Sequence, residues 1–240
     1  MRAARAIGYN SPVPGTIDVI LESGTKRVFA SAADWPGWSR GARTDNDALL
    51  SLADYAPRYA AVLRRRAQGF SPPKDSSELR VVDRVKGNAT TDFGAPGVQA
   101  PGEDAPMKPK EAERRLAILR ACWSALDRAA SRAEGVTLTK GPRGGGRDLD
   151  KILLHVVEAE GAYVHRIGGK LSLPDDMELP ARVRTAHGVV LDTVGARIRG
   201  ERPPENPRRT AALWAPRYFI RRTAWHALDH AWEIEDRSAM

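Results

Sequence analysis

The sequence predicts an α+β protein in which a small β-β-(β)-α-β domain precedes an all-α four-helix bundle. Three observations lead to this prediction. The first 86 residues mix β-favouring runs with one helical pattern, residues 87–108 are dense in Gly, Pro and Ala, and the apolar patterns beyond residue 108 recur at helical spacing. We therefore expect domains at residues 1–88 and 109–240, joined by a linker or lid loop at 89–108.

The N-terminal domain should begin with a hairpin. Thr16–Leu21 and Arg27–Ala32 favour strands and are separated by a short turn sequence. Thr44 is a suitable N-cap for one helix, whose apolar positions recur as far as Gly69. Leu79–Lys86 then returns to a strand pattern. This order of elements predicts one helix packed on one face of a small sheet.

Four apolar stripes with helical spacing follow residue 108 and predict four helices of roughly 20 residues each. Pro216 suits the first turn of the last helix. The stripes run over Leu116–Ala130, Leu149–Ile167, Val183–Ile198 and Phe219–Ile234.

Charge and composition exclude several classes of protein. The chain has 38 basic and 30 acidic residues, a net charge of +8, but both signs are interleaved, so binding of nucleic acid should be weak at most. No apolar run approaches the length of a membrane span, and the N-terminus lacks the apolar centre of a signal peptide. The single cysteine, Cys122, lies in an apolar run and should be a buried structural thiol. We expect a cytoplasmic protein.

Histidines give the strongest chemical signal. His226 and His230 are four residues apart in TAWHALDHAWEIEDR, so two imidazoles share one face of the last helix, beside its core stripe. That geometry suits two ligands of one divalent metal. His155 flanks the apolar stripe of the second helix and is the candidate third ligand. The alternative is that these are hydrogen-bonded histidines at a helix interface.

The order of one early histidine in the second helix and an HxxxH pair in the last helix resembles the DinB-like superfamily. That superfamily includes the YfiT-like proteins and the metal-binding domain of mycothiol-dependent maleylpyruvate isomerase. The resemblance covers residues 109–240 and rests on His155, His226 and His230. It implies a divalent metal that activates a low-molecular-weight thiol such as mycothiol, or water, toward a small electrophilic substrate. Zinc, nickel, iron and manganese all accept imidazole, and a thiol transferase, an isomerase and a hydrolase all remain open.

Other residues are candidates for completing this site. Asp229 and Glu233 flank the HxxxH pair and could orient its imidazoles, or could instead be solvated charges or partners of nearby arginines. His187 falls on the third stripe, either as a core histidine or as an acid/base group, and is a reserve ligand. Arg143 and Arg147 lie in the Gly-rich segment before the helix of His155. They could form an anion subsite, the alternative being a flexible connection.

The N-terminal domain carries a second resemblance. The turn Trp35-Pro36-Gly37-Trp38, Gly41 and a helix beginning at Thr44 resemble the HicB-like antitoxin fold over residues 16–86. HicB-like proteins bind a protein partner. The alternative to an enzyme is therefore a regulatory or binding protein with a structural metal, whose N-terminal domain recognises a protein or nucleic acid. In the enzyme hypothesis that domain shapes substrate access or assembles a homodimer.

Overall fold

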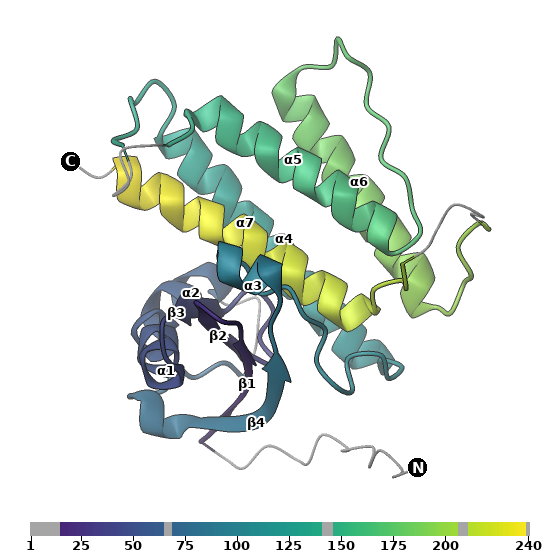
Figure 1. The fold of residues 1–240 in the computed structure, drawn as a ribbon. Coiled ribbons are helices and arrows are strands. Elements are labelled where there is room, and N and C mark those ends of the chain that lie inside the picture. The colour runs from purple at the N-terminus through teal and green to yellow at the C-terminus, as the bar shows by residue number, and fades with distance from the viewer. Residues whose placement is uncertain (1–14, 65–68, 141–145, 206–210, 239–240) are drawn as a thin grey trace. The chain divides into compact units, whose positions relative to one another are not determined.

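The protein is an α+β chain in which an N-terminal sheet is followed by helices (Figure 1). The computed structural model describes residues 15–64, 69–140, 146–205 and 211–238. The chain divides into two compact units, Met1–Pro106 and Met107–Met240. Among the helices described, none is both long enough and apolar enough to cross a membrane.

The N-terminal unit is built on a four-stranded sheet with the order β3-β2-β1-β4. β1 pairs antiparallel with β2, as the predicted hairpin requires, and pairs parallel with β4. The third strand that the sequence left optional is present and pairs with β2. The strands are β1 (Ile17–Ser23), β2 (Val28–Ala32), β3 (Ser39–Ala42) and β4 (Leu79–Lys86).

The helical segment that follows β3 contains two helices where the sequence pattern predicted one. Thr44 is the N-cap of α1 (Asp45–Asp54), as expected, and its hydroxyl accepts a hydrogen bond from the Asp47 amide at 3.1 Å. A second helix, α2 (Ala56–Leu63), begins directly afterwards. Pro57 lies in the first turn of α2, where a proline ring is tolerated. The same proline lacks a backbone N–H, so α1 cannot continue through it as one uninterrupted helix.

The Trp-Pro-Gly-Trp turn closes the core of this unit. Trp38 is fully buried, donates its indole N–H to the Leu52 carbonyl at 2.9 Å, and stacks on Tyr59 at 5.4 Å. Trp35 is half-buried and packs edge-on against Phe70. Trp38 therefore caps a small core, and its ring is inaccessible for stacking on a base.

The segment predicted as a linker belongs in part to the N-terminal unit. It contains the short helix α3 (Ala89–Phe93), which the composition did not predict, and Asn88 caps it with a reciprocal bond to Thr91. The buried carboxylate of Glu22 on β1 accepts hydrogen bonds from the Thr91 hydroxyl and, at 2.8 Å, from the Gly97 amide. These bonds attach the segment to the sheet.

The C-terminal unit contains four long helices. Their predicted apolar stripes are largely buried, including the thiol of Cys122, and burial raises the pKa of that thiol well above its usual range. α7 packs against the other three helices, and α5 also packs against α6. The helices are α4 (Pro109–Arg132), α5 (Leu149–Arg166), α6 (Leu179–Ile198) and α7 (Pro216–Ser238).

Candidate metal centre

Three histidine side chains from two helices of the C-terminal unit converge on one point. His155 lies on α5, and His226 and His230 lie one turn apart on α7. One ring nitrogen from each lies within 4.8 Å of the other two, and the Nε2 atoms of His226 and His230 are 3.2 Å apart. Within the described ranges, this is the only such group of metal-ligating side chains.

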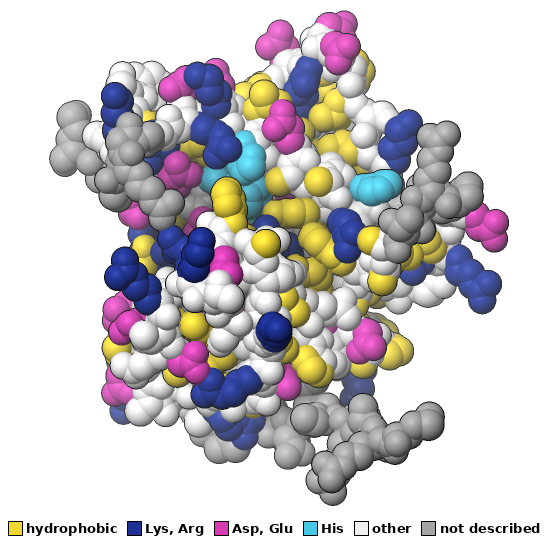
Figure 2. All heavy atoms as spheres, viewed as in Figure 1, with side chains coloured by type: hydrophobic (Ala, Val, Ile, Leu, Met, Phe, Trp, Pro, Cys, Tyr) yellow, Lys and Arg dark blue, Asp and Glu magenta, His cyan; other side chains and the backbone are white. Residues whose placement is uncertain are grey.

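The local sequence explains why these side chains meet at the border of the core. Ala227 and Ala231 on α7 are fully buried. His226 and His230 each precede one of these alanines, so both histidines lie at the edge of the buried face of the helix. His155 is half-buried on α5, which packs against α7. Histidine atoms are visible at the molecular surface next to charged side chains (Figure 2). The cluster is therefore held by packed helices while part of it remains accessible to a ligand.

The spacing of the two α7 donor atoms fits the requirements of a first-row divalent metal. Two imidazole nitrogens bound at about 2.0–2.1 Å to one zinc ion are at most ~4.2 Å apart, and ~3.3 Å apart at a tetrahedral angle. The observed 3.2 Å between the two α7 nitrogens agrees with that value. His155 approaches from the other helix, its ring centroid 5.1 Å from each of the two α7 rings.

The surroundings keep two of these imidazoles neutral, which is the state that binds a metal. Burial lowers the pKa of His226 well below its ordinary value of 6.5, and the neighbouring His230 and Arg222 act in the same direction. Burial also lowers the pKa of His155, with further contributions from His230 and Arg147. Protons therefore compete weakly for these nitrogens at neutral pH.

Glu233 orients one of the imidazoles. Its carboxylate lies 2.8 Å from Nδ1 of His230, which leaves Nε2 of that ring directed at the cluster. Arg237 donates to the other Glu233 oxygen at 2.7 Å. The hydrogen bond with His230 and the charge of Arg237 lower the pKa of the Glu233 carboxyl. Asp229, the other acid that flanks the pair, is half-buried on α7. Nδ1 of His226 has no hydrogen-bond partner among the described residues, so no carboxylate orients this second ring in the way that Glu233 orients His230.

The segment before α5 lies beside this cluster. Arg237 donates to the Thr139 carbonyl at 2.8 Å, and a Cβ at Gly146 would lie 2.3 Å from the Arg237 guanidinium. Arg147 is exposed and follows Gly146 in the chain, and its charge contributes to lowering the pKa of both His155 and His226. Arg143, the other residue of the predicted anion subsite, lies outside the described residues.

His187 belongs to a different polar group inside the same unit. Its ring stacks on the Trp123 indole at 4.0 Å, and Trp123 donates to a Glu160 oxygen at 2.7 Å. Nε2 of His187 is 3.6 Å from Glu160. Burial raises the pKa of Glu160 to about 8 and lowers that of His187 to about 4, so both are uncharged at neutral pH and form no ion pair. Neither the second Glu160 oxygen nor His187 Nε2 has a hydrogen-bond partner in the described structure.

Two neighbours of these groups, Tyr163 and Glu160, were not predicted as site residues. Tyr163 of α5 lies edge-on to His226, with 5.8 Å between ring centroids, and the Arg222 guanidinium lies 5.2 Å from the Tyr163 ring. The sequence did contain a signal for Glu160. This residue falls four positions after the buried Val156, and therefore on the inner face of α5. His165, ten residues beyond His155 on α5, is exposed.

Comparisons of the chain with protein-family models, with curated proteins and with solved structures found no match.

Proposed function

We propose that the C-terminal unit is a DinB-like four-helix bundle and a metal-dependent enzyme, with His155, His226 and His230 as ligands of one divalent metal. The observation that carries the proposal is the convergence of three imidazole nitrogens within 4.8 Å of one another. The lowered pKa values of His155 and His226 support it, because a ligating imidazole must be neutral.

A three-histidine site leaves at least one coordination position open, and this is typical of catalytic rather than structural metals. When bound, the metal would supply Lewis-acid activation of a low-molecular-weight thiol, such as mycothiol, or of water. The acceptor in either case is a small electrophilic substrate. A thiol transferase, an isomerase and a hydrolase share this requirement, and zinc, nickel, iron and manganese all suit the donor set.

The chain's own residues have separate tasks in this proposal. Glu233 fixes the ring orientation of His230, and Arg237 holds Glu233 in place. Arg147 supplies a positive charge close to the imidazoles, where it would bind the carboxylate or phosphate of an anionic substrate. Tyr163 borders His226 and limits the space on that side of the cluster.

Metal analysis of the untagged full-length protein tests the first step. We expect about one divalent metal per chain, lost in His226→Ala and retained in His165→Ala, which removes an exposed histidine from the same unit. Circular dichroism should show unchanged helicity in both variants. Equal metal loss in both variants would contradict the proposal, as would failure of the metal-free protein to bind added zinc, nickel, iron or manganese.

A second measurement distinguishes a catalytic metal from a structural one. The cobalt-loaded protein should change its visible spectrum when a low-molecular-weight thiol is added, because an open position allows the thiol to reach the metal. A spectrum that does not respond to thiols or pH, together with unfolding on chelation, would instead support the binding-protein hypothesis. In that hypothesis the metal only stabilises the bundle, and the HicB-like unit recognises a partner.

A further inference from the structure

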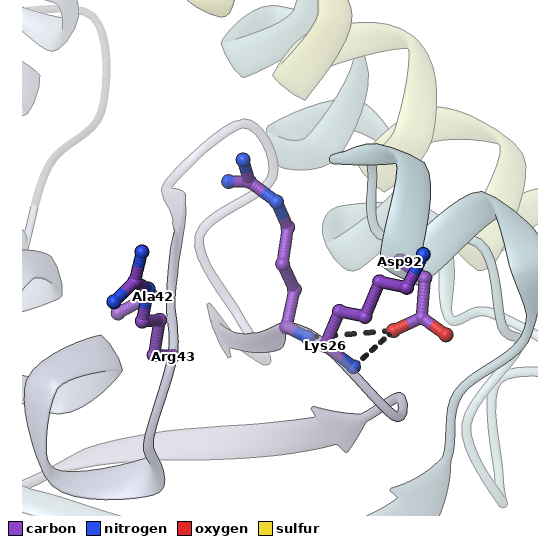
Figure 3. Close-up of a pocket in the computed structure, with 5 residues that line it drawn as sticks. Lys26, Ala42, Arg43 and Asp92 are labelled. Atoms are coloured by element: carbon purple, nitrogen blue, oxygen red, sulfur yellow. Dashed lines mark hydrogen bonds between the residues drawn. The ribbon is translucent and has the colours of Figure 1, made fainter.

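A pocket of about 310 Å³ lies in the N-terminal unit and shares no residue with the histidine cluster. It is lined by side chains from the β1–β2 turn, the end of β3 and α3 (Figure 3). Its lining residues are Lys26, Arg27, Ala42, Arg43 and Asp92. Four of the five are charged, so the lining offers charge rather than apolar surface.

Asp92, the only acidic residue in the lining, binds the turn between β1 and β2. Its carboxylate accepts hydrogen bonds from the Thr25 hydroxyl at 2.6 Å and from the amides of Lys26 and Arg27 at 2.7 and 3.3 Å. These bonds lower the pKa of the carboxyl. Gly24 makes the approach possible, because a Cβ at this position would lie 2.3 Å from an Asp92 oxygen. Asp92 therefore fixes the backbone from which two of the cations project.

Among the described residues, no acidic side chain forms an ion pair with Lys26, Arg27 or Arg43. Other arginines of the same unit are paired: Arg80 with Asp18 and Arg84 with Asp45. With Asp92 counted, the lining carries a formal charge of +2.

We propose that this pocket binds the phosphate monoester group of a small molecule. A phosphate monoester carries about −1.5 to −2 charges at neutral pH, which matches the charge of the lining. Guanidinium groups donate paired hydrogen bonds to phosphate oxygens, and the pocket offers two of them, from Arg27 and Arg43. Its volume is at the lower end for ligand sites, so it fits a small phosphorylated compound.

Charge also argues against nucleic acid as the occupant. Each phosphodiester carries a single negative charge, and nucleic-acid binding uses cations spread along a stripe that follows the strand. Here the three cations line a single pocket. Weaker binding of a diester than of a monoester is therefore a direct consequence of the proposal.

Calorimetric titration of the full-length protein with phenyl phosphate tests the pocket. The titrations use the Arg147→Ala background, which removes the charge beside the candidate metal centre, so the result does not depend on the proposed enzyme site. Arg27→Ala and Arg43→Ala should each weaken binding by at least about tenfold, because each removes a charged hydrogen-bond donor. Lys74→Ala, which removes an exposed cation of the same unit outside the pocket, should change binding by less than about twofold.

Three outcomes would overturn the proposal. They are absence of phenyl phosphate binding, equal weakening by the Lys74 and Arg27 variants, and tighter binding of dimethyl phosphate or of a single-stranded oligonucleotide than of phenyl phosphate. Asp92→Asn adds a further check, since it raises the charge of the lining but removes the anchor of the turn. We expect weaker binding in this variant, and tighter binding would show that charge alone, without the built turn, attracts the ligand.

Discussion

Replacing Glu160 with Gln should remove a pH-dependent loss of stability. Glu160 is 1% exposed, one of its oxygens has no hydrogen-bond partner in the described structure, and burial raises its pKa to about 8 from an ordinary 4.5. Between these two values the folded chain retains a proton that the unfolded chain releases, so the free energy of unfolding falls as pH rises. The fall is about 1.4 kcal/mol per pH unit for a single group, or on the order of 4 kcal/mol from pH 5 to 8.

The assay is urea unfolding of the wild type and the Glu160→Gln variant at several pH values from 5 to 8.5. His187 acts in the opposite direction, because its pKa of about 4 makes stability rise with pH up to about 6.5. That contribution is common to both proteins and cancels in their difference. The variant should gain stability relative to the wild type as pH rises, whereas Glu158→Gln, at an exposed position of α5, should show no such trend. A stability difference for Glu160→Gln that is independent of pH would refute the reasoning.

Four further predictions concern the candidate metal centre and the buried carboxylate of Glu22. Glu233→Gln should weaken metal binding about 10- to 100-fold, measured by competition with a chelating dye, because His230 loses its orienting carboxylate. Metal affinity should stay constant as pH falls to about 6.5, the ordinary histidine pKa, because burial lowers the pKa of His155 and His226 and so moves their protonation to lower pH; a decline that starts above pH 8 would contradict this. Arg147→Ala should weaken anionic ligands of the metal-loaded protein by about 1.5–3 kcal/mol in calorimetry while metal content stays unchanged. Glu22→Ala should destabilise the N-terminal unit by roughly 2–4 kcal/mol in denaturant unfolding, because it leaves buried donors of the 91–98 segment unpaired, and a loss below ~0.5 kcal/mol would show that the bonds contribute little.

The sequence predicted those features that depend on residues close together in the chain. The spacing of His226 and His230 determines that they share a helical face, whatever the helix packs against. The strand pairs of the hairpin and the cap at Thr44 are local in the same sense. The sequence also contains a signal for the break between α1 and α2, because Pro57 lies within the predicted helix. The apolar spacing continues through this proline, however, and it favoured a single helix.

Features that depend on how distant elements pack could not be derived in this way. The contact of Glu160 with Trp123 and His187 depends on the rotation of three helices about their axes, and no local pattern fixes those rotations. The contact of Arg237 with Thr139 joins residues 98 positions apart. The short helix α3 was missed because the surrounding Gly and Pro residues dominate the composition, although Asn88 and Thr91 form a capping box at its N-terminus.

The hydrogen bonds of Arg237 have a thermodynamic consequence for ligand binding. The same guanidinium contacts the segment before α5, through Thr139, and the acid that orients a histidine of the cluster, Glu233. An anion bound by Arg147, next to Gly146 and its contact with Arg237, would restrict the motion of the Arg237 guanidinium and favour the ring orientation of His230 that binds a metal. Binding free energies of two ligands are reciprocal, so the metal must raise the affinity for that anion by the same factor by which the anion raises the affinity for the metal. Substrate and metal would then be retained together, and the loss of one would promote release of the other.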